Sequence, residues 1–514
     1  MLSTNTVVKN SLISLIAQIS SMLLSFVVRS LFLKYLGLEM QGLNSVVGET
    51  LGFLSLAELG IGSAITFRLY KPLVEGDEEL IGSLMRVYQV AYRVTALIVF
   101  GVGLIMMAFL PFLIKEQTIN YDFIRLVYLI QLITSATSYL FAYKRSLLYA
   151  DQRQYICKSI DLFMNLLFSV LRIISMVLFK SFIIYLILQL LQSIISNVFV
   201  SLKCNQLYPY LVGKNAKKYE HIRDIFVDTK DILFGKIAGY VWSSTDSIVV
   251  SIFTGLTAVG GMSNYKFVIN AVKNLLHSIT EPIGATIGNF LQVKEKEDSF
   301  KMLQSYIFFR FVMIDIAATG LIVCADTFVG VFFGEQYVLE KIISILIVTD
   351  IFIGVIYGPL GEVINLLGYF REEKIISILG AVTNLGSSII LVQIMGMKGV
   401  LYGTCISQIV FLIGDSIILF KKYFKSGKKM IQLWKRYVVY AFIVIIQTII
   451  IELGVNQIFG KNYTLVVFVV EVIMCVIISV LVVFIVFRKT REYEYLINLL
   501  KKFVSVKVKN KIEK

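Results

Sequence analysis

Charged residues are scarce in this sequence of 514 residues: they make up 16% of it, whereas soluble domains carry roughly 25%. Hydrophobic residues make up 57%, and several apolar runs exceed the length of about 18 residues that crosses a bilayer. These runs lack the alternation of apolar and polar residues that a transmembrane β-barrel would show. The sequence therefore predicts an all-α polytopic membrane protein.

Signatures of soluble enzymes and metal sites are missing as well. The five cysteines stand at isolated positions, without metal or disulfide spacing: Cys157, Cys204, Cys324, Cys405 and Cys475. There is no phosphate-cradling Gly-Lys-Ser loop and no HExxH motif. With no ATP-binding motif, we expect transport to draw on an ion gradient or on downhill consumption of the substrate. No cleavable signal is evident, because the apolar run after Lys9 is long enough to remain as a span.

Fourteen apolar segments are predicted to cross the membrane as helices. They lie near residues 10–33, 43–67, 84–114, 122–143, 159–179, 181–202, 232–254, 262–291, 303–326, 340–364, 375–395, 398–420, 437–453 and 464–487. Lysine and arginine are concentrated in the connections 203–231 and 421–436 and in the tail 488–514, which predicts that both termini are cytoplasmic. The net charge of +15 is then a topology signal rather than evidence for nucleic-acid binding.

The chain contains an internal repeat. LGLEMQG at 36–42 aligns with TGLTAVG at 254–260 at an offset of 218 residues, and the same offset takes Tyr88 to Tyr306. This predicts two six-helix lobes in a parallel pseudo-twofold repeat, which enclose a cleft that opens to either side in turn. The expected divisions are an N-lobe at 1–202, a cytoplasmic linker at 203–231, a C-lobe at 232–420, two further spans at 421–487 and a basic cytoplasmic tail at 488–514.

The span predicted near 262–291 carries the densest set of ionisable residues. Four of them, at spacings of 7, 4 and 4 residues, fall on one helix face: Lys266, Lys273, His277 and Glu281. Lysines that faced lipid would be costly, so this stripe is predicted to line a hydrated cleft and to bind an anion. Snorkelling of Lys266 and an ion pair between Lys273 and Glu281 are the alternatives. Pro282 and Gly284 follow and are expected to form a hinge.

Arginines within other spans point to the same chemistry. They are Arg29, Arg93, Arg172 and Arg310. Each could instead form a buried ion pair with an acid such as Glu49, Asp161, Asp246 or Asp315. Several basic groups on one cleft suit a diphosphate, which arginine grips with a planar fork and lysine attracts as a point charge. We therefore predict diphosphate contacts at Lys273, Arg93 and Arg310, with Arg29, Arg172, Lys266 and His277 as further candidates.

Buried acids are candidates for gating or ion coupling. Glu58 lies in an apolar stretch and is followed by Gly60 and Gly62, which are expected to let the helix bend. Glu281 shares the basic stripe, and Asp246 precedes a long apolar run. Asp246 could help to bind a coupling cation together with Asn384 and Ser407, or it could simply form ion pairs between helices.

Several stretches resemble a known family of membrane transporters. They are LAELGIGSAITFRLYKPL with the following DEELIGSLM, NSLISLIAQISSMLLSFVVRSLFLKYLG, TDSIVVSIFTGLTAVGGMSNY and LLYADQR. Over essentially its whole length the chain is similar to the polysaccharide-exporter branch, of Wzx type, of the multidrug/oligosaccharidyl-lipid/polysaccharide flippase superfamily. The ELGIG stretch resembles Gram-positive capsule and teichoic-acid flippases in particular. The resemblance implies alternating access, a cationic central cavity and coupling to Na⁺ or H⁺.

The resemblance and the buried cations predict a transporter rather than an enzyme. Its expected task is to flip undecaprenyl-diphosphate-linked oligosaccharide repeat units from the inner to the outer leaflet of a bacterial plasma membrane. Its expected partners are this substrate, membrane lipids and polysaccharide polymerase machinery, without nucleic acid and without a cofactor other than a coupling ion. One alternative is a cation-coupled drug exporter, which would want an acidic, aromatic cavity. Another is a membrane polymerase or ligase, which usually needs a large outward loop that this sequence lacks.

Overall fold

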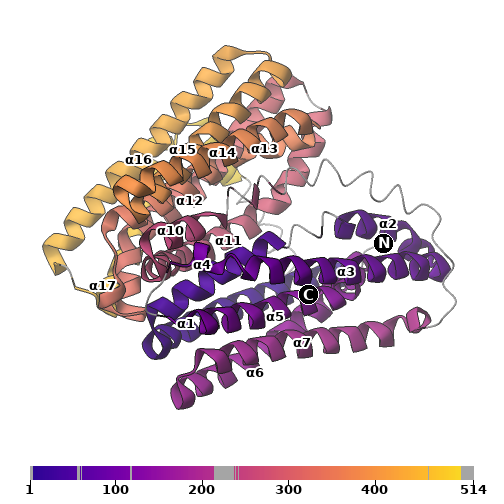
Figure 1. Cartoon of the computed structure of the whole chain (residues 1–514). Helices are drawn as coiled ribbons and strands as arrows, with labels where there is room; N and C mark the ends of the chain where they lie inside the picture. The colour runs from indigo at the N-terminus through magenta and orange to yellow at the C-terminus, as the bar shows by residue number, and fades with distance from the viewer. Residues whose placement is uncertain are drawn as a thin grey trace, which may run out of the picture. The chain divides into compact units, whose positions relative to one another are not determined.

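The computed structural model describes most of the chain, and nearly all of that as helix (Figure 1). The described residues are 4–54, 58, 61–115, 119–212, 237, 239–240, 242, 244–293, 295–460 and 462–498. No strand occurs in these ranges, which confirms the all-α fold predicted from the apolar runs. The chain forms two compact units, Met1–Ser263 and Asn264–Lys514, and the division falls within the helix α11 (Leu256–Val293). The predicted lobe boundaries stay a prediction, and most of the predicted linker lies outside the described residues.

The first unit consists of long helices with side-chain caps at several of their starts. Its elements are α1 (Thr4–Leu54), α2 (Ile61–Glu75), α3 (Glu78–Met107), α4 (Leu110–Leu113), α5 (Tyr121–Ala150), α6 (Gln154–Phe179), α7 (Phe182–Leu207), the 3-10 helix η2 (Pro209–Val212) and α10 (Asp246–Thr254). The Asp77 carboxylate accepts a hydrogen bond from the Leu80 N–H and so begins α3, and the Ser181 hydroxyl caps α7 in the same way. Helix α5 packs against α3 and α7, and α6 packs against α1 and α7.

The second unit is organised around α12 (Lys296–Phe332). With it come the rest of α11, the 3-10 helix η3 (Glu335–Tyr337), α13 (Lys341–Leu366), α14 (Phe370–Met395), α15 (Met397–Ile418), the π-helical turn η4 (Leu419–Tyr423), α16 (Gly427–Phe459) and α17 (Leu465–Phe487). Helix α12 packs against α13, α16 and α17. Its buried face therefore meets three other helices, and it carries polar as well as apolar side chains, among them Tyr306, Arg310 and Asp315.

Eleven helices in the described ranges are long and apolar enough to cross a membrane. The span predicted near 10–33 falls on α1, and the span predicted near 43–67 begins on α1 and ends on α2. The spans predicted near 232–254 and 262–291 coincide with α10 and α11, which are not among the eleven. The ten remaining predicted spans each fall on one long helix. The chain is thus a multi-pass membrane protein.

Two glycines at equivalent positions of the predicted repeat share a backbone conformation that favours glycine. Gly37, which bends α1, has φ 86° and ψ 172°. Gly255, between α10 and α11, has φ 89° and ψ 172°. A residue with a Cβ would be strained at either position, because positive φ brings the Cβ against the backbone. The repeat seen in the sequence therefore reappears as a repeat of backbone geometry.

A reciprocal helix contact follows these two bends. A Cβ on Gly42 would lie 1.9 Å from the carbonyl oxygen of Leu256, and a Cβ on Gly260 would lie 2.2 Å from that of Leu38. Leu38 and Leu256 are themselves 218 residues apart, as are the two glycines. Each copy of the motif thus presents its glycine to the backbone of the other, a close approach that only small residues permit.

Candidate functional site

In the first unit, Glu58 meets tyrosines of α3 and α5. Its carboxylate accepts a hydrogen bond from the Tyr92 hydroxyl. The rings of Tyr88 and Tyr92 pack edge to face with their centroids 4.8 Å apart, and the Tyr139 ring lies 6.3 Å from that of Tyr92. Within the described ranges no cation pairs with Glu58. This carboxylate therefore lies in an aromatic environment with a phenol as its hydrogen-bond donor.

Gly62 lets α2 approach this cluster closely. The Tyr88 hydroxyl lies 3.0 Å from the Gly62 carbonyl oxygen and 3.0 Å from the Ser146 hydroxyl. A Cβ on Gly62 would come within 2.5 Å of both Glu58 Oε1 and the Tyr92 hydroxyl. One predicted hinge residue thus lies directly against the predicted gating acid. The other, Gly60, lies outside the described residues.

In the second unit, Arg310 forms a buried ion pair with Glu362. The guanidinium of Arg310, which is 6% exposed, binds Glu362 Oε1 and donates to the Tyr306 hydroxyl at 2.7 Å. Tyr306 in turn donates to Glu362 Oε2 at 2.8 Å, so the three side chains form a closed network. The Tyr306 hydroxyl also lies 3.4 Å from the Thr280 carbonyl oxygen of α11. Arg310 is thereby neutralised within its own unit.

These two clusters occupy equivalent positions of the repeat. Tyr88 meets the Gly62 carbonyl in one unit, Tyr306 meets the Thr280 carbonyl in the other, and both partners are offset by 218 residues. The same offset takes Tyr92 to Arg310. One turn beyond the shared tyrosine, the first unit therefore has a phenol where the second has a guanidinium.

Two of the predicted phosphate ligands are exposed and unpaired. Arg93 lies in α3 and Lys273 in α11, each well inside its helix. Within the described ranges neither side chain has a hydrogen-bond or ion-pair partner. A cation in this state keeps its full charge available for an anionic ligand. The structure leaves these two side chains free, whereas it commits Arg310.

The other predicted basic residues of the first unit gather near Tyr185 on α7. The Arg172 guanidinium lies 5.4 Å from the centre of the Tyr185 ring and donates to the Ser169 hydroxyl at 3.0 Å. Arg29 interacts electrostatically with the same tyrosine and donates to the Ser263 hydroxyl at 2.7 Å. Both arginines are half-buried and engaged with neutral groups. They form a group separate from Arg93, whose partners they are not.

The stripe on α11 is present as a helical face. Lys266 is half-buried, and His277 is exposed like Lys273. Helix α11 continues unbroken through Pro282 and Gly284 to Val293. The side chain of Glu281 and those of the two expected hinge residues lie outside what the structure describes.

Asp246 begins α10 and is 5% exposed. Its neighbour Ser247 binds both carboxylate oxygens of Glu49, through its hydroxyl at 2.6 Å and its N–H at 3.2 Å. In the second unit, Asn384 donates to the Thr404 hydroxyl at 3.1 Å and Ser407 to the Thr404 carbonyl at 2.7 Å. The predicted coupling residues thus take part in two separate hydrogen-bonded groups.

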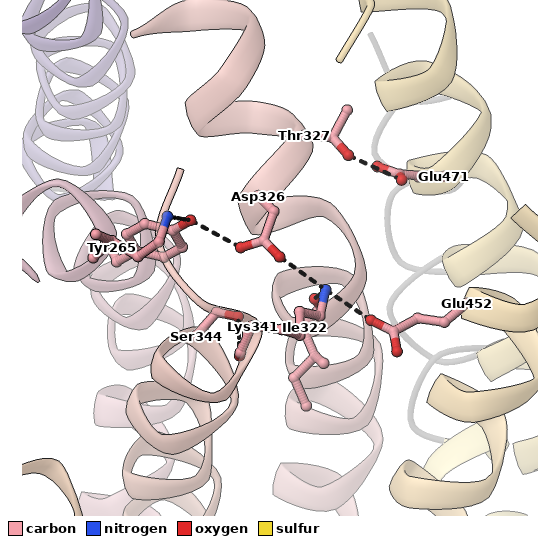
Figure 2. Close-up of polar contacts among 9 residues, drawn as sticks. Tyr265, Ile322, Asp326, Thr327, Lys341, Ser344, Glu452 and Glu471 are labelled. Carbon is pink, nitrogen blue, oxygen red and sulfur yellow. Dashed lines mark hydrogen bonds and ion pairs between the residues drawn. The ribbon is translucent and has the colours of Figure 1, made fainter. Parts of the chain in front are cut away.

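A lysine that the topology argument treated as an ordinary loop residue is the centre of an ion network (Figure 2). Lys341, at the start of α13, lies 2.7 Å from Glu452 Oε1 on α16 and 3.3 Å from Asp326 Oδ2 on α12. The Tyr265 hydroxyl donates to the other oxygen of Asp326 at 2.9 Å. Four helices of the second unit are linked in this way. The acid within the apolar run of α16 was the sequence signal that could have revealed it.

Arg145 was likewise missed as the partner of Asp161. Two guanidinium nitrogens bind the two carboxylate oxygens at 2.8 Å each, the fork geometry that makes such pairs strong. Ser196 and Asn197 of α7 complete the network, at 2.7 Å from Asp161 and 2.8 Å from Arg145. This network joins α5, α6 and α7 and leaves Asp161 unavailable to the predicted arginines.

Comparison with known structures places the fold. The chain superimposes on the lipid II flippase MurJ in an inward closed conformation with a TM-score of 0.64 at 14% identity, covering 93% of this chain and 99% of MurJ. It also matches an inward-facing multidrug resistance MATE family transporter of the MOP superfamily (TM-score 0.58, 13% identity, 82% and 99% covered). The Vibrio cholerae MATE transporter VcmN gives a TM-score of 0.55 at 15% identity, with 83% and 99% covered.

Sequence comparison identifies the family. A probable low-salt glycan biosynthesis flippase, Agl15 of Haloferax volcanii, is 21% identical over 201 residues, or 38% of this chain. The match spans 42% of that relative, less than half of its length. The profile of the polysaccharide biosynthesis protein family matches residues 7–283, more than half of the chain. Family and fold both bear out the prediction of a transporter rather than an enzyme. The chain belongs to the polysaccharide biosynthesis protein family and has the fold of the flippase superfamily that includes MurJ and the MATE transporters.

Proposed function

We propose that this protein flips undecaprenyl-diphosphate-linked oligosaccharide repeat units from the cytoplasmic to the outer leaflet for cell-surface polysaccharide synthesis. Membership of the polysaccharide biosynthesis family supports a glycan substrate. The names of two similar proteins, a glycan biosynthesis flippase and a lipid II flippase, support a lipid-linked one. The polyprenyl tail would stay in the bilayer while the diphosphate and sugars pass through a hydrated path.

The observation that carries this proposal is the pair of unpaired intramembrane cations, Arg93 and Lys273. A charged side chain within a span is costly unless water, an opposite charge or a ligand satisfies it. A diphosphate supplies two negative charges and several acceptor oxygens, so it satisfies both a guanidinium and an ammonium. Arg310, by contrast, is already satisfied by Glu362 and would contribute only if that pair opened.

The remaining features of the proposal concern the cellular setting. We expect the bacterial plasma membrane as its location, with both termini cytoplasmic, because the basic connections and tail favour the cytoplasmic side. A gradient of Na⁺ or H⁺ would drive the alternation, and polysaccharide polymerase machinery would receive the product. Capsule or teichoic-acid type glycans of Gram-positive bacteria are the proposed substrate class.

The test is flipping in reconstituted vesicles. Proteoliposomes loaded with a short undecaprenyl-diphosphate oligosaccharide that bears a fluorescent sugar would report arrival in the accessible leaflet through a membrane-impermeant quencher. Loss of one charge-assisted contact should slow arrival about tenfold or more in Arg93→Gln and in Lys273→Gln. The charge-preserving Arg93→Lys and Lys273→Arg variants should keep more of the rate.

Arg125→Gln is the matched control, because Arg125 is an exposed arginine whose pair with Asp122 is a surface contact. It should flip at the wild-type rate. Wild-type protein that folds but leaves the lipid-linked sugar in its original leaflet would overturn the proposed function. Full rates in both charge-removing variants would remove Arg93 and Lys273 from the substrate path.

A second candidate, a cation-coupled exporter of small molecules, is favoured by one observation. Glu58 with Tyr88, Tyr92 and Tyr139 is an acidic, aromatic cluster of the kind that suits an organic cation. Export of a cationic dye by vesicles containing wild-type protein, abolished in Glu58→Gln and unaffected in Lys273→Gln, would select this function. The opposite pattern, in which only the lipid-linked sugar moves, selects the flippase.

A further inference from the structure

Asp315 lies within α12, fully buried, in contact with a glutamine of α16. Its Oδ1 accepts a hydrogen bond from Gln447 Nε2 at 2.5 Å, and the same Nε2 lies 2.6 Å from the Thr319 hydroxyl. The exposed fraction is 0% for Asp315 and 1% for Gln447. An acidic group and an amide therefore face each other in the interior of the second unit.

Two atoms of this contact lack a hydrogen-bond partner: Asp315 Oδ2 and Gln447 Oε1. Both atoms can accept a proton, and buried polar atoms without a partner are rare in native proteins. An ionised carboxylate here would in addition bury a full negative charge against neutral groups, which is strongly unfavourable. The site as drawn is therefore short of one hydrogen.

No cation of the surrounding helices balances Asp315. Apart from lysines in the first ten residues of α12 and α16, the cations on α12, α13, α16 and α17 are Arg310, Lys341 and Arg436. Each of the three forms an ion pair with another acid in the described structure: Glu362; Asp326 with Glu452; and Glu492, respectively.

The other titratable groups that these helices present carry no positive charge. They are Asp350 on α13, Tyr440 on α16, and Glu471 and Cys475 on α17. Additional acids would oppose a second negative charge on Asp315. Neutralisation must then come from a ligand of Asp315 itself.

We propose that Asp315 binds a proton in the folded protein and forms a carboxylic acid–amide pair with Gln447. A proton on Oδ2 removes the charge and provides the donor that Gln447 Oε1 lacks. The reverse amide orientation leads to the same requirement, because the amide oxygen would then face Asp315 Oδ1 and need a proton between the two. A metal cation fits less well, since Oδ1 already faces an N–H and hard cations require several oxygen ligands.

This proton site is distinct from the substrate and gating residues and does not depend on the proposed function. It lies where α12 meets α16, one of the two helices that the sequence places outside the repeat. Release of the proton would place an unbalanced charge between these helices and would favour their separation. The proton thus acts as a ligand that holds α16 on the second unit.

Stability as a function of pH tests the proposal. An unfolded aspartate releases its proton above a pH of about 4, whereas folded Asp315 keeps it. The folded state then holds one proton more than the unfolded state, so stability falls as pH rises. Between about pH 5 and pH 7 the unfolding constant of the wild type should rise tenfold per pH unit relative to Asp315→Asn, which has no proton to lose. Unfolding would be followed in mixed micelles by fluorescence.

Asp161→Asn is the matched control, because Asp161 is ionised against Arg145. It should destabilise the protein at every pH, whereas Asp315→Asn should be at least as stable as the wild type at neutral pH. Infrared spectra at neutral pH should contain a protonated-carboxyl C=O band that shifts in D₂O and disappears in Asp315→Asn. The proposal is wrong if Asp315→Asn leaves that region unchanged, or if its stability follows the wild type in parallel across pH.

Discussion

The two units place the same tyrosine in the same setting and surround it with different charges. Tyr88 and Tyr306 each reach the carbonyl of the residue 26 positions before them. In the first unit the neighbouring acid, Glu58, has a phenol as its partner. In the second unit Glu362 has a guanidinium. The helix framework is thus shared while the electrostatics differ, with a closed ion pair in one unit and an uncompensated acid in the other.

This difference assigns different roles to the two units. A buried ion pair holds helices together as long as both partners remain, and removal of one partner leaves a charge without compensation. An acid with only a neutral donor can take up or release a cation or a proton without breaking an ion pair. We therefore infer that the second unit is electrostatically closed around Tyr306 and that the first unit is the one open to exchange at Glu58.

The largest effect should come from opening the closed pair. Glu362→Ala leaves the guanidinium of Arg310 buried without an acid, and the free energy of unfolding should fall by about 3 kcal/mol. The value lies at the low end of the range for buried pairs because the Glu362 side chain is 37% exposed. Denaturant unfolding in detergent measures it.

The double variant Arg310→Met with Glu362→Leu is the control for this loss. It removes both charges, so it should recover most of the stability that Glu362→Ala forfeits. A double variant as unstable as the single one would show that hydrogen bonds to Tyr306, rather than the uncompensated charge, dominate this site.

The shared framework itself is tested at the reciprocal glycines. Gly42→Ala and Gly260→Ala each place a Cβ against a backbone oxygen, and each should cost about 1–3 kcal/mol through forced displacement of the helices. Equal losses would support the reciprocal contact. Gly101→Ala is the control, because nothing lies within 4 Å of the added carbon, and it should stabilise α3 by about 0.5–1 kcal/mol. A neutral Gly42→Ala would show that the helices can separate freely.

The two tyrosines offer a direct comparison of charge environments. Tyr306→Phe removes hydrogen bonds to an arginine and a glutamate and should cost about 1.5–3 kcal/mol, the range for bonds to charged groups. Tyr88→Phe removes bonds to a carbonyl and a hydroxyl and should cost about 0.5–1.5 kcal/mol. Denaturant unfolding of both variants under one condition gives the difference. Equal costs would contradict the distinction between the units.

The framework could be predicted from the sequence because it rests on local patterns. Apolar runs of spanning length gave the helices, and two glycines per motif at a fixed offset gave the repeat that recurs as matched backbone angles. Pairing could not be predicted in the same way. The partner of Arg310 lies 52 residues away on another helix, and that of Gln447 lies 132 residues away. Helix periodicity indicates which residues share a face but not which face they meet.

Candidate site residues were predictable as a class rather than as a set. An ionisable residue within a span is unusual enough to be noticed, which is how Arg93, Lys273 and Glu58 were selected. Whether such a residue is free or paired depends on contacts between helices. Arg310 and Arg93 look alike in the sequence, yet the structure buries one against Glu362 and leaves the other exposed.

The smallest stability effect is expected at Glu58, where the first unit is open. Glu58→Gln keeps an acceptor for the Tyr92 hydroxyl and leaves no buried cation behind, so unfolding should change by less than about 0.5 kcal/mol. If the free carboxylate exchanges a coupling ion, the same variant should still bind substrate while its transport no longer responds to an imposed Na⁺ or H⁺ gradient. Gradient-driven flipping in vesicles, measured beside unfolding in detergent, separates these properties. A loss of stability as large as that of Glu362→Ala would mean that Glu58 is paired like its counterpart and that the two units are electrostatically alike.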